Sequence, residues 1–380
     1  MVIPISCRVF TLSMTIQKAI TILFCAFSGT IHAQSELRLA IASGTDDSAI
    51  ELSFTSKPTK IYRIEKSTDL NQFSLLAMID GTGNRFTVRL IADQNQQFYR
   101  ALELSALITA GEILQLESPP PDHKIKYGNG PLQFGNLRIP KGDGPHPVVI
   151  FLHGGCWLSQ FKIGHTALLE QALAREGYSV WSIEYRRIGD EGGGWPGTFN
   201  DVGQGADHLR EVASQFNLDL TKVVASGHSA GGQLALWLAA RSTLSNEIEI
   251  YSENPLPIHG VVGLAPAPDL EGLHKARVCG HVIDPLMEGS PLEFPSHYAN
   301  ASPMQLAPIG VPQALVIGTR DDFWGPIGQA YFKRAVEAGD NQVRVVQAPE
   351  SGHFEMIVPT TSSWPVVRKA FQTLFLEIAD

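Results

Sequence analysis

The sequence predicts an α/β protein with a mostly parallel sheet flanked by helices, preceded by a small all-β module. From residue 123 onward, apolar runs alternate with longer helical stretches, which is typical of a parallel sheet covered on both faces. Between residues 37 and 104, short alternating runs are separated by turn residues. The proline-rich segment SPPPD at 118–122 divides the two patterns.

The first 33 residues have the pattern of a signal peptide. Arg8 and Lys18 precede the apolar stretch 19–27, and small residues follow up to Ala33, where we expect cleavage. The apolar stretch is too short to cross a bilayer, so we expect no transmembrane segment. This pattern predicts a secreted or periplasmic protein.

Residues 34–104 are predicted to form a small β-sandwich-like module. The expected strands are 37–42, 49–55, 60–66, 73–79, 86–91 and 97–104. The stretch 62–70, together with Phe98, Tyr99 and Arg100, resembles accessory modules of the fibronectin type III kind. Residues 105–122 are expected to be a stiff linker to the second domain.

Residues 123–380 are predicted to hold the larger α/β domain. The expected strands are 148–152, 178–183, 222–226, 260–264, 313–317 and 342–347. The expected helices are 167–176, 199–216, 233–241, 326–338 and 364–378. The stretch 269–308, inserted between two core strands, is expected to cover the site.

Composition limits the partners. The chain has 380 residues, 44% of them hydrophobic and 18% charged, and its formal net charge of −9 comes without long runs of like charge. This argues against nucleic acid and favours a small neutral or weakly charged molecule. No phosphate-binding loop or dinucleotide motif is present, so we expect no cofactor. His274, Cys279 and His281 match no familiar zinc spacing, so we expect no metal.

The motif GHSAGG at 227–232 follows an apolar strand and opens a helix. This strand, turn and helix context is the one that a nucleophilic serine needs, because the sharp turn leaves the Ser229 hydroxyl exposed. Gly227 and Gly231 leave room for that turn. The N–H of Ala230 at the helix N-terminus is predicted to help stabilise an oxyanion.

The motif HGGCW at 153–157 follows another apolar strand. Paired glycines let backbone N–H groups approach a reacting oxygen, so Gly154 and Gly155 are the candidate oxyanion donors, with Cys156 a weaker one. We expect His153 to brace the loop rather than act as a base. Trp157 is expected to line the substrate pocket, with core packing as the alternative.

Candidates for the catalytic acid and base follow the last two predicted strands. Asp321 and Asp322 follow one strand, and His353 follows the next. The order serine, acid, histidine suits this fold, with His353 as general base and Asp321 as the carboxylate that orients it. Asp321 is preferred over Asp322 because it falls in the first turn after the strand.

The two cysteines outside the signal segment are Cys156 and Cys279. An export compartment would permit a disulfide, but the sequence does not show whether the two residues meet. We expect two free, buried thiols.

The motifs HGGCW, EYRR at 184–187, GGWPG at 193–197, GHSAGG and GHFE at 352–355 occur in this order. Residues from about 125 to 379 therefore resemble bacterial esterase and lipase-like α/β-hydrolases, a neighbourhood that includes kynurenine formamidase and feruloyl esterase-like enzymes. The HGGxW form resembles the formamidase group most. The resemblance implies Ser229, Asp321 and His353 as the triad, with Gly154, Gly155 and Ala230 as oxyanion donors.

The expected function is hydrolysis of a small carboxylic ester through an acyl-enzyme. Export and an accessory module make an acylated carbohydrate one candidate substrate. The alternatives are an arylformamidase-like amide hydrolase, which would use the same residues, and a catalytically silent binding protein.

Overall fold

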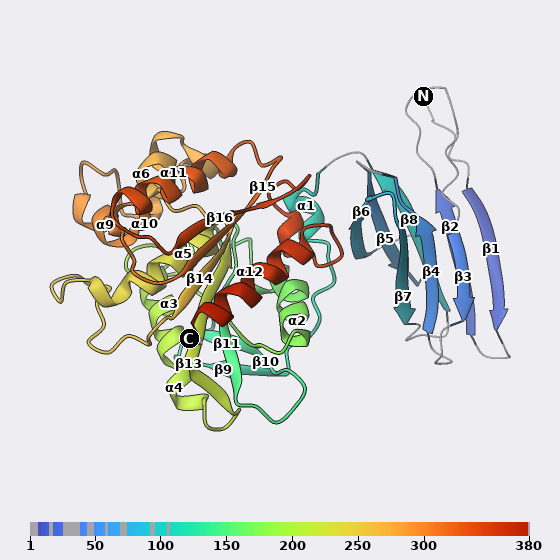
Figure 1. Ribbon diagram of the computed structural model, residues 1–380, viewed down its shortest axis with the longest axis horizontal. Coiled ribbons are helices and arrows are strands. Elements are labelled where there is room, and N and C mark those ends of the chain that lie inside the picture. The colour runs from blue at the N-terminus through green and yellow to red at the C-terminus, as the bar shows by residue number, and fades with distance from the viewer. Residues whose placement is uncertain are drawn as a thin grey trace. The chain divides into compact units, whose positions relative to one another are not determined.

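The computed structural model describes residues 7–14, 18–25, 39–43, 49–57, 60–68, 74–91, 96–104 and 107–378. The chain divides into two compact units (Figure 1). The N-terminal unit comprises residues 1–117 and 360–362, and the C-terminal unit comprises residues 118–359 and 363–380.

The N-terminal unit contains two sheets. The first has the order β1-β2-β8-β5-β6 and the second the order β3-β4-β7. Phe54 and Tyr62, one from each sheet, are buried with their ring centroids 4.8 Å apart, so the two sheets share a core. This confirms the predicted sandwich-like module. The strands are β1 (Cys7–Met14), β2 (Lys18–Cys25), β3 (Leu39–Ser43), β4 (Ala49–Thr55), β5 (Ile61–Ser67), β6 (Ser74–Asp80), β7 (Arg85–Ile91) and β8 (Gln96–Leu104).

The strands β1 and β2 lie within the segment predicted to be a signal peptide. They pair with each other in antiparallel fashion, and β2 pairs in parallel with β8. The expected cleavage point after Ala33 lies outside the described residues. The signal peptide therefore stays a prediction from the sequence.

The segment 105–122 contains more structure than the expected linker. Helix α1 (Ala110–Ile113) begins with a capping box, in which Thr109 Oγ1 accepts from the Glu112 N–H and the Thr109 N–H donates to Glu112 Oε2. In the C-terminal unit, the Arg138 guanidinium donates to the carbonyls of Pro119 and Pro120, each at 2.7 Å. Buried Arg138 thus fixes these two prolines within the C-terminal unit.

The C-terminal unit is built on an eight-stranded sheet with the order β16-β15-β14-β13-β11-β12-β10-β9. The six strands from β11 to β16 pair in parallel, and β10 and β9 join one edge in antiparallel orientation. The strands are β9 (His123–Lys126), β10 (Phe134–Arg138), β11 (His146–Leu152), β12 (Ser179–Ile183), β13 (Leu218–His228), β14 (Gly260–Leu264), β15 (Gln313–Gly318) and β16 (Val343–Ala348). All six predicted strands are present.

Helices cover both faces of this sheet (Figure 1). On one face α2 and α12 lie together, joined by an ion pair between Arg368 and Glu176. On the other, Trp181 of the sheet donates to the Gly205 carbonyl of α3, and Phe199 of α3 packs edge-on against Trp237 of α5. These helices are α2 (Ala167–Arg175), α3 (Gly197–Asp207), α4 (Leu209–Val212), α5 (Ala230–Ala240), α11 (Trp324–Glu337) and α12 (Trp364–Glu377), with short 3₁₀ turns η1 (Ile163–Thr166), η2 (Arg241–Thr243) and η3 (Glu355–Ile357).

The insertion between β14 and β15 consists of short helices. They are α6 (Leu270–Lys275), α7 (Val278–His281), α8 (Ile283–Leu286), α9 (Pro295–Ala301) and α10 (Pro303–Leu306). Buried Leu270, Leu273 and Ile283 anchor them to the core. The insertion is thus part of the packed unit and not a free loop.

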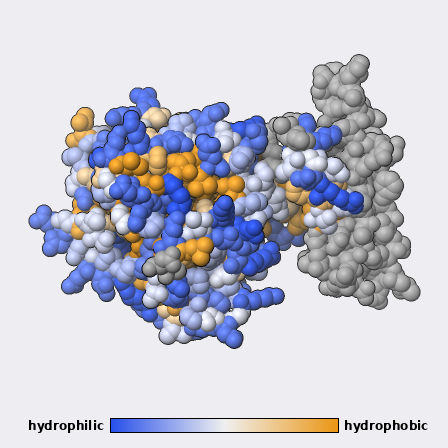
Figure 2. All heavy atoms as spheres, in the orientation of Figure 1, coloured by the Kyte–Doolittle hydropathy of each residue, from blue (hydrophilic) through white to orange (hydrophobic). Residues whose placement is uncertain are grey.

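Figure 2 shows a largely hydrophilic face with an apolar area over the region where Figure 1 draws β15 and β16. Strand β16 is the edge of the sheet, and its Val345 and Val346 are half-buried. Within the described ranges, no helix combines the length and hydrophobicity that crossing a membrane requires.

Candidate active site

Ser229 lies at a strained turn between β13 and α5. Its backbone has φ 55° and ψ −118°, a conformation that an ordinary turn does not need. The Ser229 N–H donates to the Leu264 carbonyl at 2.9 Å, and the Ser229 carbonyl accepts from the Ala267 N–H at 3.2 Å. The strand β14 and the loop after it therefore hold the turn in place.

Two glycines make this turn possible. A Cβ at Gly227 would collide with the Gly231 carbonyl, and one at Gly231 would collide with the carbonyl of Leu152. Backbone therefore packs directly on backbone between β11, β13 and α5. This close packing confirms the strand, turn and helix context predicted for GHSAGG.

Asp321 and His353 are paired. The His353 Nδ1–H donates to Asp321 Oδ2 at 2.8 Å, and Asp321 Oδ1 accepts from the Trp324 N–H at 3.1 Å. Asp321 is buried, whereas Asp322 is exposed to solvent. Both Asp321 oxygens thus have partners, and the pairing leaves Nε2 as the free nitrogen of His353.

His228 connects the serine turn to the His353 loop. Its Nε2–H donates to the His353 carbonyl at 2.8 Å, and the two rings lie 4.6 Å apart. Burial, followed by the neighbouring His353 and His165, lowers the pKa of His228 well below its ordinary value, so this ring stays neutral. The contact brings the predicted base loop next to Ser229.

Trp324 is a neighbour that sequence reasoning missed. Its ring stacks on His353, with centroids 5.1 Å apart and planes inclined by 21°. The backbone N–H of Trp324 donates to Asp321, and its ring contacts His353. One residue therefore fixes both members of the pair. Its position two residues after Asp322 was the one available signal.

The glycine pair of HGGCW lies against the serine turn. A Cβ at Gly154 would collide with the His228 carbonyl, which places this glycine beside the peptide that leads into Ser229. Gly155 has φ 108°, a left-handed conformation that glycine adopts freely. Among the described residues, the N–H groups of Gly154, Gly155 and Ala230 have no hydrogen-bond acceptor. They are available to a ligand oxygen.

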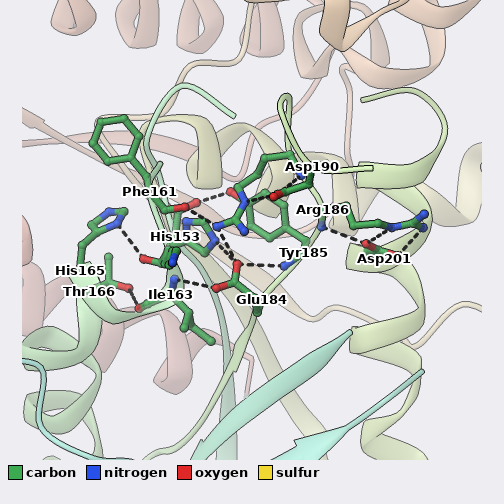
Figure 3. Close-up of polar contacts among 12 residues, drawn as sticks. His153, Phe161, Ile163, His165, Thr166, Glu184, Tyr185, Arg186, Asp190 and Asp201 are labelled. Carbon is green, nitrogen blue, oxygen red and sulfur yellow. Dashed lines mark hydrogen bonds and ion pairs between the residues drawn. The ribbon is translucent and has the colours of Figure 1, made fainter. Parts of the chain in front are cut away.

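A buried charged network holds the start of this loop (Figure 3). His153 contacts Glu184 Oε1 through Nε2 at 3.0 Å and the Gly154 carbonyl through Nδ1 at 2.9 Å. Both ring nitrogens thus contact oxygens inside the protein. His153 therefore braces the loop, as expected.

Glu184 is the centre of this network. It also pairs with Arg187 Nη1 at 2.9 Å and accepts from the Ile163 N–H at 3.1 Å. Burial alone would raise the pKa of Glu184, but His153 and then Arg187 hold it below its ordinary value. Next to this network, Arg186 makes a bidentate pair with Asp201 (Figure 3).

Trp157 does not line a pocket as predicted. It is 1% exposed, belongs to the hydrophobic core, and donates from Nε1 to Gln233 Oε1 at 3.1 Å. The positive φ at Cys156 and Trp157 turns the loop inward after Gly155 and so buries the indole. Trp157 is therefore a core residue, which was the alternative to a pocket role.

The prediction of two free, buried thiols is wrong. Cys156 and Cys279 form a disulfide with a Cα–Cα distance of 6.3 Å, within the usual range for such bonds. Cys279 is exposed and Cys156 is half-buried. The folded insertion brings α7 to the oxyanion loop across 123 residues of sequence, which no local pattern reveals.

The parallel sheet, the strained serine turn and the acid–histidine pair at the ends of its last strands define a protein of the α/β-hydrolase fold. More specifically, the BD-FAE family profile matches residues 137–331, just over half of the chain, and the chain belongs to this family.

Among individual relatives, the chain is 26% identical to "Esterase LipC" of Mycobacterium tuberculosis over 241 residues, which cover 60% of this chain and 59% of LipC. The chain therefore spans about three fifths of the length of that relative.

Two solved structures share the fold. Inhibited esterase B from Lactobacillus rhamnosis has a TM-score of 0.60 at 22% identity, with 69% of this chain and 90% of that chain covered. A truncated carbohydrate esterase from gut microbiota has a TM-score of 0.55 at 16% identity, with 67% and 95% covered.

Proposed function

We propose that this protein is a serine carboxylesterase. The observation that carries the proposal is the His353–Asp321 pair beside the strained Ser229 turn. The N–H groups of Gly154, Gly155 and Ala230 have no acceptor in the part of the chain that the structure describes. Membership of the BD-FAE family and similarity to a relative named as an esterase support the same activity.

The reaction follows from these groups. Ser229 Oγ attacks the ester carbonyl carbon while His353 takes the hydroxyl proton. The N–H groups of Gly154, Gly155 and Ala230 stabilise the resulting oxyanion. His353 then gives the proton to the departing alkoxide, and the acyl group stays on Ser229. Water, activated by His353, attacks next and releases the acid, while Asp321 stabilises the imidazolium throughout.

We further propose that the protein acts outside the cytoplasm, as a secreted or periplasmic enzyme. The basic and apolar pattern of residues 1–33 supports export, with cleavage after Ala33. The Cys156–Cys279 disulfide fits an oxidising compartment. An acylated carbohydrate is the proposed type of substrate, which the gut carbohydrate esterase with the same fold supports.

The decisive experiment compares wild type with Ser229→Ala on p-nitrophenyl acetate, butyrate and octanoate, and on N-formylkynurenine. We expect wild type to cleave the short esters and the variant to lose about six orders of magnitude in kcat. Turnover of the formamide alone would replace this proposal with the kynurenine formamidase-like alternative. Equal turnover by both proteins would disprove the role of Ser229, and no turnover at all would favour a binding protein.

A further inference from the structure

We infer that the Cys156–Cys279 disulfide positions the oxyanion donors, so that turnover depends on this bond being closed. The inference rests on the proposed function, because acyl transfer is the reaction that would use those N–H groups. Cys156 directly follows the second candidate donor, Gly155, and Cys279 comes from the insertion between β14 and β15.

Contacts hold the two ends of the oxyanion loop more firmly than its middle. At the first end His153 is bonded to buried Glu184. At the second end the Trp157 carbonyl accepts from the Ile188 N–H at 2.8 Å, and its indole bonds Gln233. Between these ends, the carbonyls of Gly154 and Gly155 contact His153 Nδ1 and the Leu158 N–H, which belong to the same stretch of chain, and the described N–H groups of the two glycines have no acceptor. The disulfide at Cys156 is the covalent tie of this middle part.

The backbone conformation of the oxyanion loop is intrinsically unfavourable. Gly155, Cys156 and Trp157 have φ values of 108°, 54° and 52°. Cys156 and Trp157 are not glycines, so the left-handed region costs them free energy that their surroundings must offset. The indole of Trp157 is fixed by burial and a hydrogen bond. Cys156 is half-buried, and its sulfur bond supplies the constraint.

The other end of the disulfide lies on a well-anchored segment. Val278 and Val282, on either side of Cys279, are buried in the core. The residues around them also take left-handed φ values, namely Arg277 (53°), Cys279 (48°), Gly280 (73°) and His281 (66°). This turn presents Cys279 to Cys156 while its neighbours stay packed. Cys279 therefore acts as a fixed point for the oxyanion loop.

Opening the bond should act on the transition state more than on substrate binding. The oxyanion forms only after attack, so displaced donors lower kcat and leave KM little changed. Complete loss of one oxyanion donor costs about 100- to 1,000-fold in kcat. Because a loosened loop keeps its donors, we expect a smaller loss, of about 10- to 100-fold.

The test uses the full chain, purified without reductant, with and without dithiothreitol. The exposed Cys279 makes the bond accessible to this dithiol. Reduction breaks the S–S bond and leaves two thiols, while dithiothreitol supplies two electrons and two protons and becomes a cyclic disulfide. Peptide mass mapping establishes whether the Cys156–Cys279 link is closed or open in each sample.

We expect reduced wild type and the double variant Cys156→Ser/Cys279→Ser to lose about 10- to 100-fold in kcat, with KM changed less than about threefold. The double variant should not respond to dithiothreitol, and reoxidised wild type should recover. The matched control Ala276→Ser, at an exposed position in the same segment, should keep its kcat and respond like wild type. If the double variant fails to fold, reduction and reoxidation of wild type still test whether kcat depends on the disulfide.

Unchanged kcat in a sample whose link is demonstrably open would overturn the inference while Ser229→Ala still supports the esterase. A rise in KM at constant kcat would also overturn it, because the bond would then shape substrate binding. If oxidised wild type neither turns over esters nor reacts with a phosphonate at Ser229, the proposed function fails, and this inference fails with it.

Discussion

Two loops flank Ser229, and the structure holds them by different means. The oxyanion loop begins in a buried cluster of charges around Glu184 and is tied by a disulfide at Cys156. The base loop is held by the Asp321 bond, the His228 bond to the His353 carbonyl and the stacked ring of Trp324. A buried charge cluster and a covalent bond hold the first loop, whereas hydrogen bonds and ring contacts hold the second.

The difference matches what each loop has to do in the proposed reaction. Oxyanion donors work best when they are already in place before charge develops, so rigidity is useful there. The imidazole of His353 has to exchange protons with two partners in turn, so it needs a fixed orientation but also an exchangeable proton. We therefore expect changes on the base side to lower the rate, and changes on the oxyanion side to lower stability as well.

In the comparison of the two loops, the largest effect is expected from Asp321→Asn. An amide at this position can no longer fix the His353 tautomer or stabilise the imidazolium, so kcat should fall about 10,000-fold. The shape of the side chain is kept, so the urea midpoint should shift little. Steady-state kinetics on a short p-nitrophenyl ester, together with urea unfolding, measure both quantities.

Asp322→Asn is the matched control for this change. Asp322 is the adjacent, exposed carboxylate. Its replacement should leave kcat within about twofold of wild type, since surface substitutions have small effects. Equal losses in the two variants would mean that the pairing of Asp321 with His353 does not define the acid.

The second largest effect is expected from Glu184→Gln, which should lower the free energy of unfolding. The change leaves His153 and Arg187 buried without their shared carboxylate, and breaking such a pair costs about 3 to 5 kcal/mol. Glu377→Gln, which removes the partner of Arg344 in a more exposed pair, should cost less than about 1 kcal/mol. Equal unfolding free energies for the two variants would contradict a tightly held oxyanion side.

The smallest effect concerns pH and the neutral ring of His228. Its pKa is lowered in the folded protein, so below about pH 6.5 the unfolded chain binds a proton that the folded chain does not. Stability should therefore fall as the pH falls from 6.5, by about 1.4 kcal/mol per pH unit for this one group. Urea unfolding of wild type and His228→Gln between pH 7 and 5.5 measures it. Parallel pH profiles would exclude His228 as a source of the slope.

Much of the larger unit was predictable because its central strands are buried on both faces and read as continuous apolar runs. The antiparallel strands β9 and β10 were missed, since HKIK and FGNLR are short and neither is a continuous apolar run. The helix expected over 199–216 is divided, with α3 ending at Asp207 and α4 beginning at Leu209. The short helices of the insertion are too brief to show a helical period.

The candidate site residues could be predicted from motifs in the loops that follow parallel strands. These loops meet because the carboxyl ends of parallel strands lie at one edge of the sheet. Contacts between distant loops could not be read in the same way. The Cys156–Cys279 bond depends on how the insertion folds. The burial of Trp157 depends on the left-handed backbone of Cys156 and Trp157, which the sequence does not predict. Both features lie where tertiary contacts override local preference.

The glycine contacts at the serine turn also bear on attempts to evolve a new substrate preference. Gly227 and Gly231 face backbone carbonyls that cannot move aside, so libraries that vary these codons will consist largely of misfolded clones. The exposed Phe323 beside Trp324, by contrast, borders the base loop without supporting the turn. Diversity placed at Phe323 and at exposed positions of the insertion such as Leu292 would leave the buried anchors of the insertion and the Cys279 bond untouched.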